Sequence, residues 1–276
     1  MRIVTLVDNV VNGGGLQAEH GLSLYIETDG KKILFDTGQS DCYLLNAHKL
    51  GIDIADIDFV VLSHGHYDHT GGLTSFLERN SKARVYAKRG VFDPKYGDNN
   101  LFIGTEIKEV LLRNRLVYVD TITEIAEGVF LMPDIPLHHA IDTHFTGMYR
   151  KVDGQLVVDE FEDELFMVLK RGEKINILTA CSHRGITNIC TTATDYFKLP
   201  VGLILGGFHM KACTTEQYVH ITHFLRLLEP ESVGVCHCTG LERFADMYHE
   251  CEAHLFYSYT GSEVELICTE CFEPQL

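Results

Sequence analysis

Three imidazoles and one carboxylate fall within six consecutive positions, at His64, His66, Asp68 and His69. Imidazole nitrogen and carboxylate oxygen are good ligands for first-row metal ions. The apolar run 59–62 in front of them predicts a buried strand, and a loop at a strand end can aim alternate side chains at one point, with glycines allowing tight turns. We therefore predict a metal centre here, because a solvated polar loop does not need so dense a set of ligands.

The spacing His-x-His-x-Asp-His resembles the defining motif of the metallo-β-lactamase superfamily and matches it in full. Three further pieces follow that superfamily's order: Asp36 in a Phe-Asp-Thr-Gly run, His183 after the run 174–178, and His237 after the run 232–235. The resemblance implies that Asp36 orients a ligand histidine without touching metal, with an ordinary turn aspartate as the alternative. It implies two ligand sets, which are His64, His66 and His183 for the first cation and Asp68, His69 and His237 for the second.

The segment 203–209, Leu-Ile-Leu-Gly-Gly-Phe-His, departs from the pattern of many dinuclear members, which carry a bridging aspartate there. Fewer anionic ligands put the affinity and occupancy of the second site in question. His209 is a candidate substrate ligand or general acid; metal ligation ranks lower, and a packing role is the alternative. Together with the segments 6–9, 19–23 and 181–188, this run resembles the subgroup named 7,8-dihydropterin-6-yl-methyl-4-(β-D-ribofuranosyl)aminobenzene 5′-phosphate synthase.

Two groups of polar residues outside the motif are candidates for contact with substrate. Glu19 and His20 follow a run of three glycines, so we predict a substrate-binding loop at the mouth of the site, with a buried ion pair or a turn contact as an equally supported alternative. His138, His139 and His144 follow two prolines. We expect an exposed or substrate-facing loop there rather than a further metal site.

Nine cysteines at scattered spacings are an odd number in a chain too long to need a disulfide framework, which fits thiols kept reduced in the cytosol. Cys236 and Cys238 flank His237 and alternate away from it if the segment is extended, so we expect small buried thiols. Cys268 and Cys271 have the spacing of zinc knuckles and thiol redox centres, but the sequence has no second such pair.

Strands alternate with helices along the chain, in two similar halves. With the resemblance, this pattern predicts an α/β fold, an αββα sandwich in which two mixed β-sheets pack face to face with helices on the outside. The expected strands are 3–7, 22–28, 32–35, 59–62, 84–86, 165–170, 174–178, 201–205 and 232–235, and the expected helices are 42–50, 72–79, a segment beyond 185, and 215–228. We expect one domain over 1–276, with a substrate-covering insertion near the irregular segment 90–128.

The amino-acid composition limits the classes of partner that the protein is expected to bind. A formal net charge of -16 without a basic cluster argues against nucleic acid as a partner. The sequence contains no uninterrupted run of about 18 apolar residues, so we expect no membrane span. Asp8 interrupts the N-terminal apolar stretch before it could act as a signal peptide. We therefore expect a cytoplasmic protein. The expected partner is a small-molecule substrate, phosphorylated or not, and the oligomeric state is left open.

These observations favour a metal-dependent hydrolase in which a metal-activated water attacks an ester or phosphoester, Asp68 orients that water, and His209 serves as acid or substrate ligand. The expected cofactor is two divalent cations, zinc first and manganese or iron next. The subgroup resemblance implies an alternative, a dihydropteroate-synthase-like transferase that joins a dihydropterin pyrophosphate to a ribofuranosylaminobenzene phosphate. A non-catalytic metal-containing ligand-binding module is the third hypothesis, against which the complete motif argues.

Overall fold

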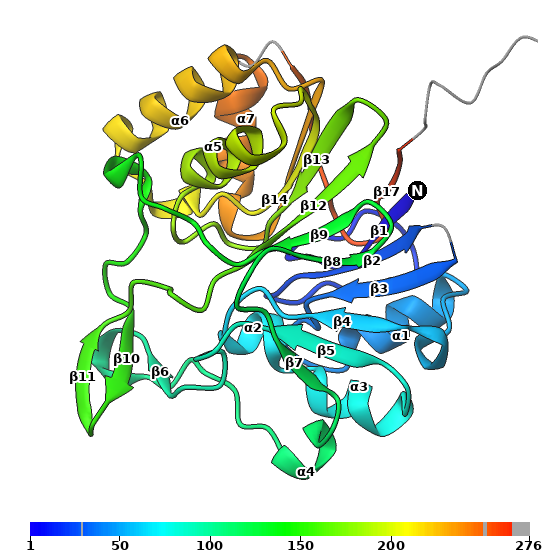
Figure 1. Cartoon of the computed structure of the whole chain (residues 1–276). Helices are drawn as coiled ribbons and strands as arrows, with labels where there is room; N and C mark the ends of the chain where they lie inside the picture. Colours follow the sequence, from blue (N-terminus) through cyan, green and yellow to red (C-terminus); the bar gives the residue numbers. More distant parts are fainter. Residues whose placement is uncertain (29, 251–252, 267–276) are drawn as a thin grey trace, which may run out of the picture.

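The computed structural model describes residues 1–28, 30–250 and 253–266, and within that part of the chain two seven-stranded sheets form the centre of the fold (Figure 1). The first sheet has the order β17-β1-β2-β3-β4-β5-β7 and the second the order β16-β15-β14-β13-β12-β9-β8. Both sheets are mixed, since β3, β4, β5 and β7 run parallel in one and β13 to β16 in the other, while the remaining neighbours pair antiparallel.

The first sheet's strands are β1 (Arg2–Val7), β2 (Ser23–Thr28), β3 (Lys31–Phe35), β4 (Phe59–Val61), β5 (Arg84–Ala87), β7 (Leu116–Tyr118) and β17 (Glu263–Glu265). The second sheet's are β8 (Thr123–Ala126), β9 (Val129–Met132), β12 (Phe166–Arg171), β13 (Lys174–Leu178), β14 (Val201–Gly206), β15 (Ser232–Val235) and β16 (His254–Tyr257). The helices are α1 (Cys42–Lys49), α2 (Tyr67–Thr70), α3 (Leu73–Arg79), α4 (Glu109–Leu112), α5 (Ile186–Phe197), α6 (Thr215–Leu228) and α7 (Leu241–Tyr248).

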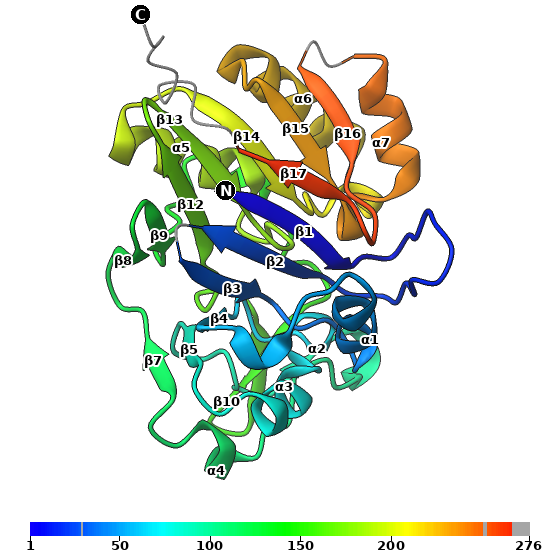
Figure 2. The ribbon, with the colours of Figure 1, turned by 90° about the vertical axis from the view of Figure 1, so that its right-hand side faces the viewer.

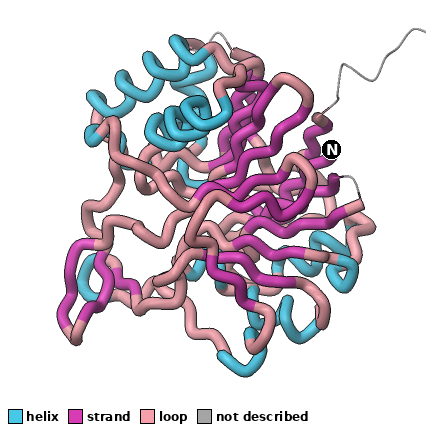
Figure 3. Tube along the Cα trace, viewed as in Figure 1, coloured by secondary structure: helices cyan, strands magenta, loops and turns pink. Residues whose placement is uncertain are grey.

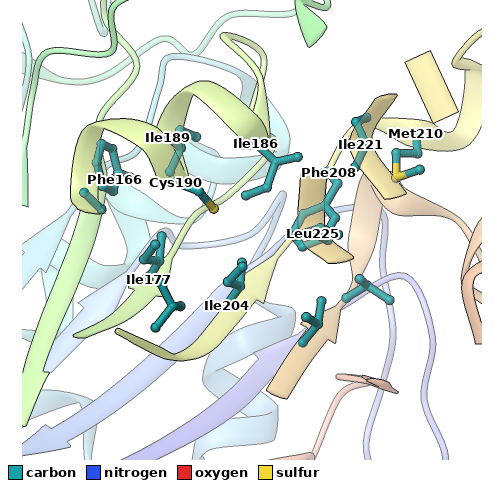
Figure 4. Packing of buried hydrophobic residues seen from close by; sticks show 14 of the residues in the cluster. Phe166, Ile177, Ile186, Ile189, Cys190, Ile204, Phe208, Met210, Ile221 and Leu225 are labelled. Carbon is teal, nitrogen blue, oxygen red and sulfur yellow. The ribbon is translucent and has the colours of Figure 1, made fainter. Parts of the chain in front are cut away.

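Three apolar cores lie between the layers of sheets and helices. Figure 2 shows the two sheets between their helices. In β3, Ile33 and Phe35 point into the core between the sheets, whereas Leu34 points to the core under α1 and α3, as the two-residue period of a strand requires. On the other side α5 and α6 cover β13, β14 and β15, and Figure 4 shows Ile186 and Ile189 against that sheet. The predicted αββα sandwich is confirmed.

Segments without a clear sequence pattern form small elements at one end of the molecule. Within 90–128 lie β6 (Lys95–Tyr96), α4 and β7, and β7 completes an edge of the first sheet. β6 pairs with β10 (Tyr149–Val152), which pairs with β11 (Gln155–Val158), giving the small projecting sheet visible in Figure 3. Whether this region covers substrate stays a prediction. None of the helices in the described ranges is both long and apolar enough to cross a membrane.

Candidate metal centre

Four loops that follow parallel strands meet at one edge of the two sheets. The loop after β4 carries the His64–His69 motif and leads into α2, and the loop after β13 carries His183. The loops after β14 and β15 carry His209 and His237. Because parallel neighbours end at the same edge, residues more than a hundred positions apart reach one another. The motif comes from the first sheet and the other histidines from the second, so the cluster bridges the sandwich.

The first ligand set is assembled as a triangle of imidazoles. One ring nitrogen each from His64, His66 and His183 lies within 4.8 Å of the other two. The Nδ1 atom of His64 meets Ser63 Oγ at 2.9 Å, and that of His183 meets the His144 carbonyl at 3.2 Å. The three Nε2 atoms are buried and have no hydrogen-bond partner within the described residues. A buried polar atom left without a partner costs about 1–3 kcal/mol. These three nitrogens are therefore suited to act as ligands of a cation.

Burial keeps the three imidazoles of this triangle unprotonated. Burial holds the pKa of His64 and of His183 well below the ordinary value and lowers that of His66 to about 3. All three rings are therefore neutral near pH 7, with nitrogen lone pairs free to bind metal.

Asp36 holds His69 in place from behind. The Asp36 carboxylate is fully buried; its Oδ2 accepts a hydrogen bond from Ser63 Oγ at 2.6 Å and lies 2.7 Å from His69 Nδ1. Burial opposes a charge on His69, but the carboxylates of Asp68 and Asp36 outweigh it and raise the pKa of His69 to about 9. A proton must therefore leave His69 Nε2 before that nitrogen can bind a cation. Asp36 thus contacts the ring of His69, a predicted ligand, and its orienting role stays a prediction.

The second set centres on Asp68. Its Oδ2 lies 3.3 Å from His237 Nε2, 3.7 Å from His69 Nε2 and 3.2 Å from His20 Nε2. Burial raises the pKa of Asp68, yet His69, His20 and His237 together hold it well below its usual range. His20 thus reaches the ligand cluster itself, although its side chain is 55% exposed. The structure brings the three predicted ligands together and adds His20 at their solvent side.

Glu19 does not face the cluster. Its Oε1 accepts hydrogen bonds from the backbone N–H groups of Gln39 and Ser40, both at 3.0 Å. With the carboxylate engaged in this way, the geometry supports the turn contact, and binding of substrate by Glu19 stays a prediction. His138, His139 and His144 also separate: His139 packs against His220, while His144 lies beside His209 with ring centroids 5.1 Å apart.

His209 lies between the predicted ligand set and His144. Its ring centroid is 4.4 Å from that of His183, and its buried Nδ1 has no hydrogen-bond partner in the described part of the chain. His209 has a φ of 51°, a left-handed conformation that turns the chain at the end of β14. His209 and His144 together present two imidazoles next to the first ligand set.

Several residues around the centre carried no role in the sequence interpretation. Asp8, directly after β1, accepts a hydrogen bond from the His237 backbone N–H at 2.6 Å, and Asn9 Oδ1 lies 2.9 Å from His237 Nδ1. Glu164 accepts hydrogen bonds from the backbone N–H groups of His183 and Arg184, and burial raises its pKa to about 7. Polar residues directly after a buried strand were the available signal for Asp8 and Asn9.

A buried ion triad supports the motif loop. Lys95 Nζ, from β6, lies 2.6 Å from Asp159 and 2.9 Å from Asp163, and all three side chains are almost fully buried. Asp163 also accepts a hydrogen bond from the Gly65 backbone N–H at 2.9 Å. The 90–128 segment thereby contributes a residue that fixes the position of the loop between His64 and His66.

The thiols lie closer to the centre than predicted. The segment 236–238 is not extended, because residues His237–Thr239 form a 3₁₀ turn in which His237 has a φ of 51°. Cys238 therefore points inward, and its sulfur groups with Cys181 and His237 within 4.8 Å. Because the segment is not extended, Cys238 does not alternate away from the site, whereas the expectation of buried thiols holds for both Cys236 and Cys238. Cys268 and Cys271 lie outside the described residues.

Comparisons with known proteins agree with this geometry. The sequence profile of the metallo-beta-lactamase superfamily matches residues 16–153. An uncharacterized protein of Methanocaldococcus jannaschii is 30% identical over 82% of this chain and 86% of its own. From the same organism, a protein named 7,8-dihydropterin-6-methyl-4-(beta-D-ribofuranosyl)-aminobenzene-5'-phosphate synthase is 28% identical over 88% of each chain.

Among solved structures, Tm1679, described as a metal-dependent hydrolase of the beta-lactamase superfamily, superposes with a TM-score of 0.85 at 33% identity. The match covers 96% of this chain and 99% of that one. Fold, motif and full-length likeness agree, and the chain belongs to the metallo-beta-lactamase superfamily.

Proposed function

We propose that the protein is a metal-dependent hydrolase that acts on an ester or phosphoester of a small molecule and holds two divalent cations, zinc first and manganese or iron as alternatives. One observation carries the proposal: the Nε2 atoms of His64, His66 and His183 are buried in one cluster with no hydrogen-bond partner in the described ranges. Imidazole and carboxylate donors suit these metals. The 33% identical Tm1679, described as a metal-dependent hydrolase, supports the reaction class.

The ligand sets proposed are those of the resemblance, with His64, His66 and His183 for one cation and Asp68, His69 and His237 for the other. A cation held by histidines with an open position would lower the pKa of a bound water from its ordinary high value to about 7 and so would supply hydroxide near neutral pH.

The protein's own residues contribute position and protons. Asp68, whose pKa lies well below its usual range, is an anion at neutral pH and can accept a hydrogen bond from water beside the two ligand sets. His209 and His144 lie on the other side of His183 and offer N–H donors to a substrate oxygen or a leaving group. The arrangement suits an anionic group such as a phosphoester, since imidazole donors favour negative charge.

The decisive experiment measures metal content per chain by elemental mass spectrometry, in the native protein and in His237→Ala. We expect two ions in the native protein and a fall toward one in the variant. His48→Ala, which removes an exposed histidine at the end of α1, is the control and keeps both ions. One ion that is unaffected by His237→Ala would remove His237 as a ligand, and no ion after reconstitution would refute the metal-dependent function.

A second candidate reaction has one specific support, the name of the 28% identical relative, which matches over 88% of this chain. In that reaction the same residues bind a dihydropterin pyrophosphate and a ribofuranosylaminobenzene phosphate. The aromatic amine nitrogen bonds to the pterin methylene carbon as the carbon–oxygen bond to pyrophosphate breaks, and pyrophosphate and the amine proton leave. Incubating the metal-loaded protein with both compounds distinguishes the reactions: a joined product supports the transferase, whereas turnover of phosphodiester or thioester probes alone supports the hydrolase. A metal-loaded protein without turnover in either assay is a ligand-binding module.

We further propose that the protein is cytoplasmic and acts on a small-molecule substrate. The buried free thiols at Cys181, Cys190 and Cys236 fit a reducing compartment, which supports a cytoplasmic protein. The net charge of -16 supports a small-molecule substrate rather than nucleic acid.

A further inference from the structure

The sulfur of Cys181 lies in the middle of the ligand cluster. Cys181 follows β13 by three residues and is 2% exposed, and its Sγ lies 3.2 Å from His69 Nε2. The same sulfur lies within 4.8 Å of nitrogen atoms from both predicted ligand sets and of further possible ligand atoms. These atoms belong to His64, His69, His183, His209, His237 and Cys238. No other thiol in the described ranges has contacts of this kind with both predicted ligand sets.

The backbone explains why sulfur occupies this place. Many dinuclear relatives carry a bridging aspartate in the segment at the end of β14, where this chain has Gly206 as the last residue of the strand and Gly207 directly after it. A Cβ atom at Gly206 would lie 2.2 Å from the Thr179 carbonyl oxygen, and one at Gly207 would lie 2.5 Å from both the Ala180 carbonyl and Cys238 Sγ. The loop after β13 is therefore pressed against the end of β14. That contact leaves no room for a side chain at Gly206 or Gly207, and the β13 loop brings its own side chain, Cys181, to the cluster.

A comparison within the chain separates a ligand from a packing thiol. Cys190, equally buried, packs among Ile186, Ile189 and their apolar neighbours, as Figure 4 shows. Cys181 faces imidazole nitrogens instead, which gain little from an apolar neighbour. Cys238 is held by the backbone, since its Sγ accepts from the His209 N–H at 3.3 Å and contacts the Cys181 carbonyl at 3.6 Å.

We propose that Cys181 binds metal as a thiolate and supplies the anionic ligand that the absent aspartate supplies elsewhere, between the two histidine sets. This inference rests on the proposed metal-dependent function and deepens it. A thiolate is a soft ligand, so its presence favours zinc or iron over magnesium and manganese at the second site. It also restores the negative charge that the glycines at the end of β14 remove.

The native, metal-loaded protein gives the first test. X-ray absorption at the zinc edge separates a Zn–S shell at about 2.3 Å from Zn–N and Zn–O shells at about 2.0–2.2 Å. We expect a sulfur shell in the native protein. In the cobalt(II) form we expect a near-ultraviolet sulfur-to-cobalt charge-transfer band.

Three variants assign that sulfur. Cys181→Ser should abolish both the shell and the band, and Cys190→Ser, the equally buried control, should keep both. Cys238→Ser should also keep the band. A band that survives Cys181→Ser, or that disappears only in Cys238→Ser, overturns the assignment.

The native measurement remains decisive if Cys181→Ser fails to fold. A native protein that holds two cations with only nitrogen and oxygen neighbours overturns the thiolate ligand and leaves the proposed function intact. A native protein that binds no cation overturns both.

Discussion

Replacing Asp36 by asparagine tests how the chain orients a ligand. The Asp36 carboxylate faces three donors: the Ser63 backbone N–H at 2.8 Å, the Ser63 hydroxyl at 2.6 Å and His69 Nδ1 at 2.7 Å. Its two oxygens accept from all of them. An amide has a single acceptor oxygen, so in Asp36→Asn the NH₂ group must face a donor whichever way it turns.

The amide orientation of lower free energy decides how the substitution affects metal affinity. A backbone N–H cannot become an acceptor, but the Ser63 hydroxyl can rotate and the His69 ring can move its hydrogen from Nδ1 to Nε2. The amide NH₂ therefore faces His69, whose Nε2 then carries hydrogen and has no lone pair for a cation. Loss of such an orienting partner costs about 10–100-fold in metal affinity, or about 1.4–2.7 kcal/mol. Asparagine tolerates the Asp36 φ of 60°, so the backbone is preserved.

The assay is a competition titration of the metal-free protein with zinc against a chromophoric chelator, with circular dichroism to check the fold. We expect the weaker of the two zinc affinities to fall by the stated factor. Asp56→Asn, an exposed partner of Lys32, is the control and leaves both affinities unchanged. Native affinity at both sites in Asp36→Asn would refute the argument that Asp36 fixes the ring of His69.

Three further predictions concern stability. Lys95→Met leaves two aspartates buried without their cation, so urea denaturation should show a loss of about 3–5 kcal/mol; Lys174→Met, in an exposed pair, should lose about 1 kcal/mol or less, and equal losses would contradict the role of the triad. Gly207→Ala overpacks the end of β14 against Cys238, so thermal unfolding should show a loss of about 1–3 kcal/mol; an unchanged melting temperature would mean that this loop gives way. Zinc at 100 times its Kd should raise the free energy of unfolding by about 2.7 kcal/mol; calorimetry with and without chelator measures this, and no shift would argue against a cation bound to the folded state.

The regular sandwich was predictable because its central strands are mostly apolar and buried. The strand before the motif, the run 174–178 and the run 232–235 were expected within one or two residues of β4, β13 and β15. Each leads directly to a predicted ligand, so the positions of His64, His183 and His237 follow from short-range pattern. Short or exposed elements such as β10 and β11 have no apolar period to detect, and their pairing with β6 depends on tertiary contacts.

The immediate surroundings of the ligands were harder to predict, because they depend on backbone conformation rather than on residue type. Cys238 faces inward only because His237 adopts a positive φ and turns the segment into a 3₁₀ helix. Glu19 is turned toward backbone N–H groups that the sequence does not place beside it. The contact of Asp8 with His237 joins positions 229 residues apart, which no local pattern can indicate.

That separation has a consequence for biosynthesis. Chains emerge from the ribosome N-terminal end first and fold in units as they do. A nascent chain that has reached β12 carries the motif from His64 to His69 but lacks the loops after β13 and β15. Such a chain lacks His183 and His237, and so it can offer only part of each predicted ligand set. If the proposed ligand sets hold cations, we expect both to be filled only late in synthesis, after the second sheet has docked, so that metal uptake would report completed folding.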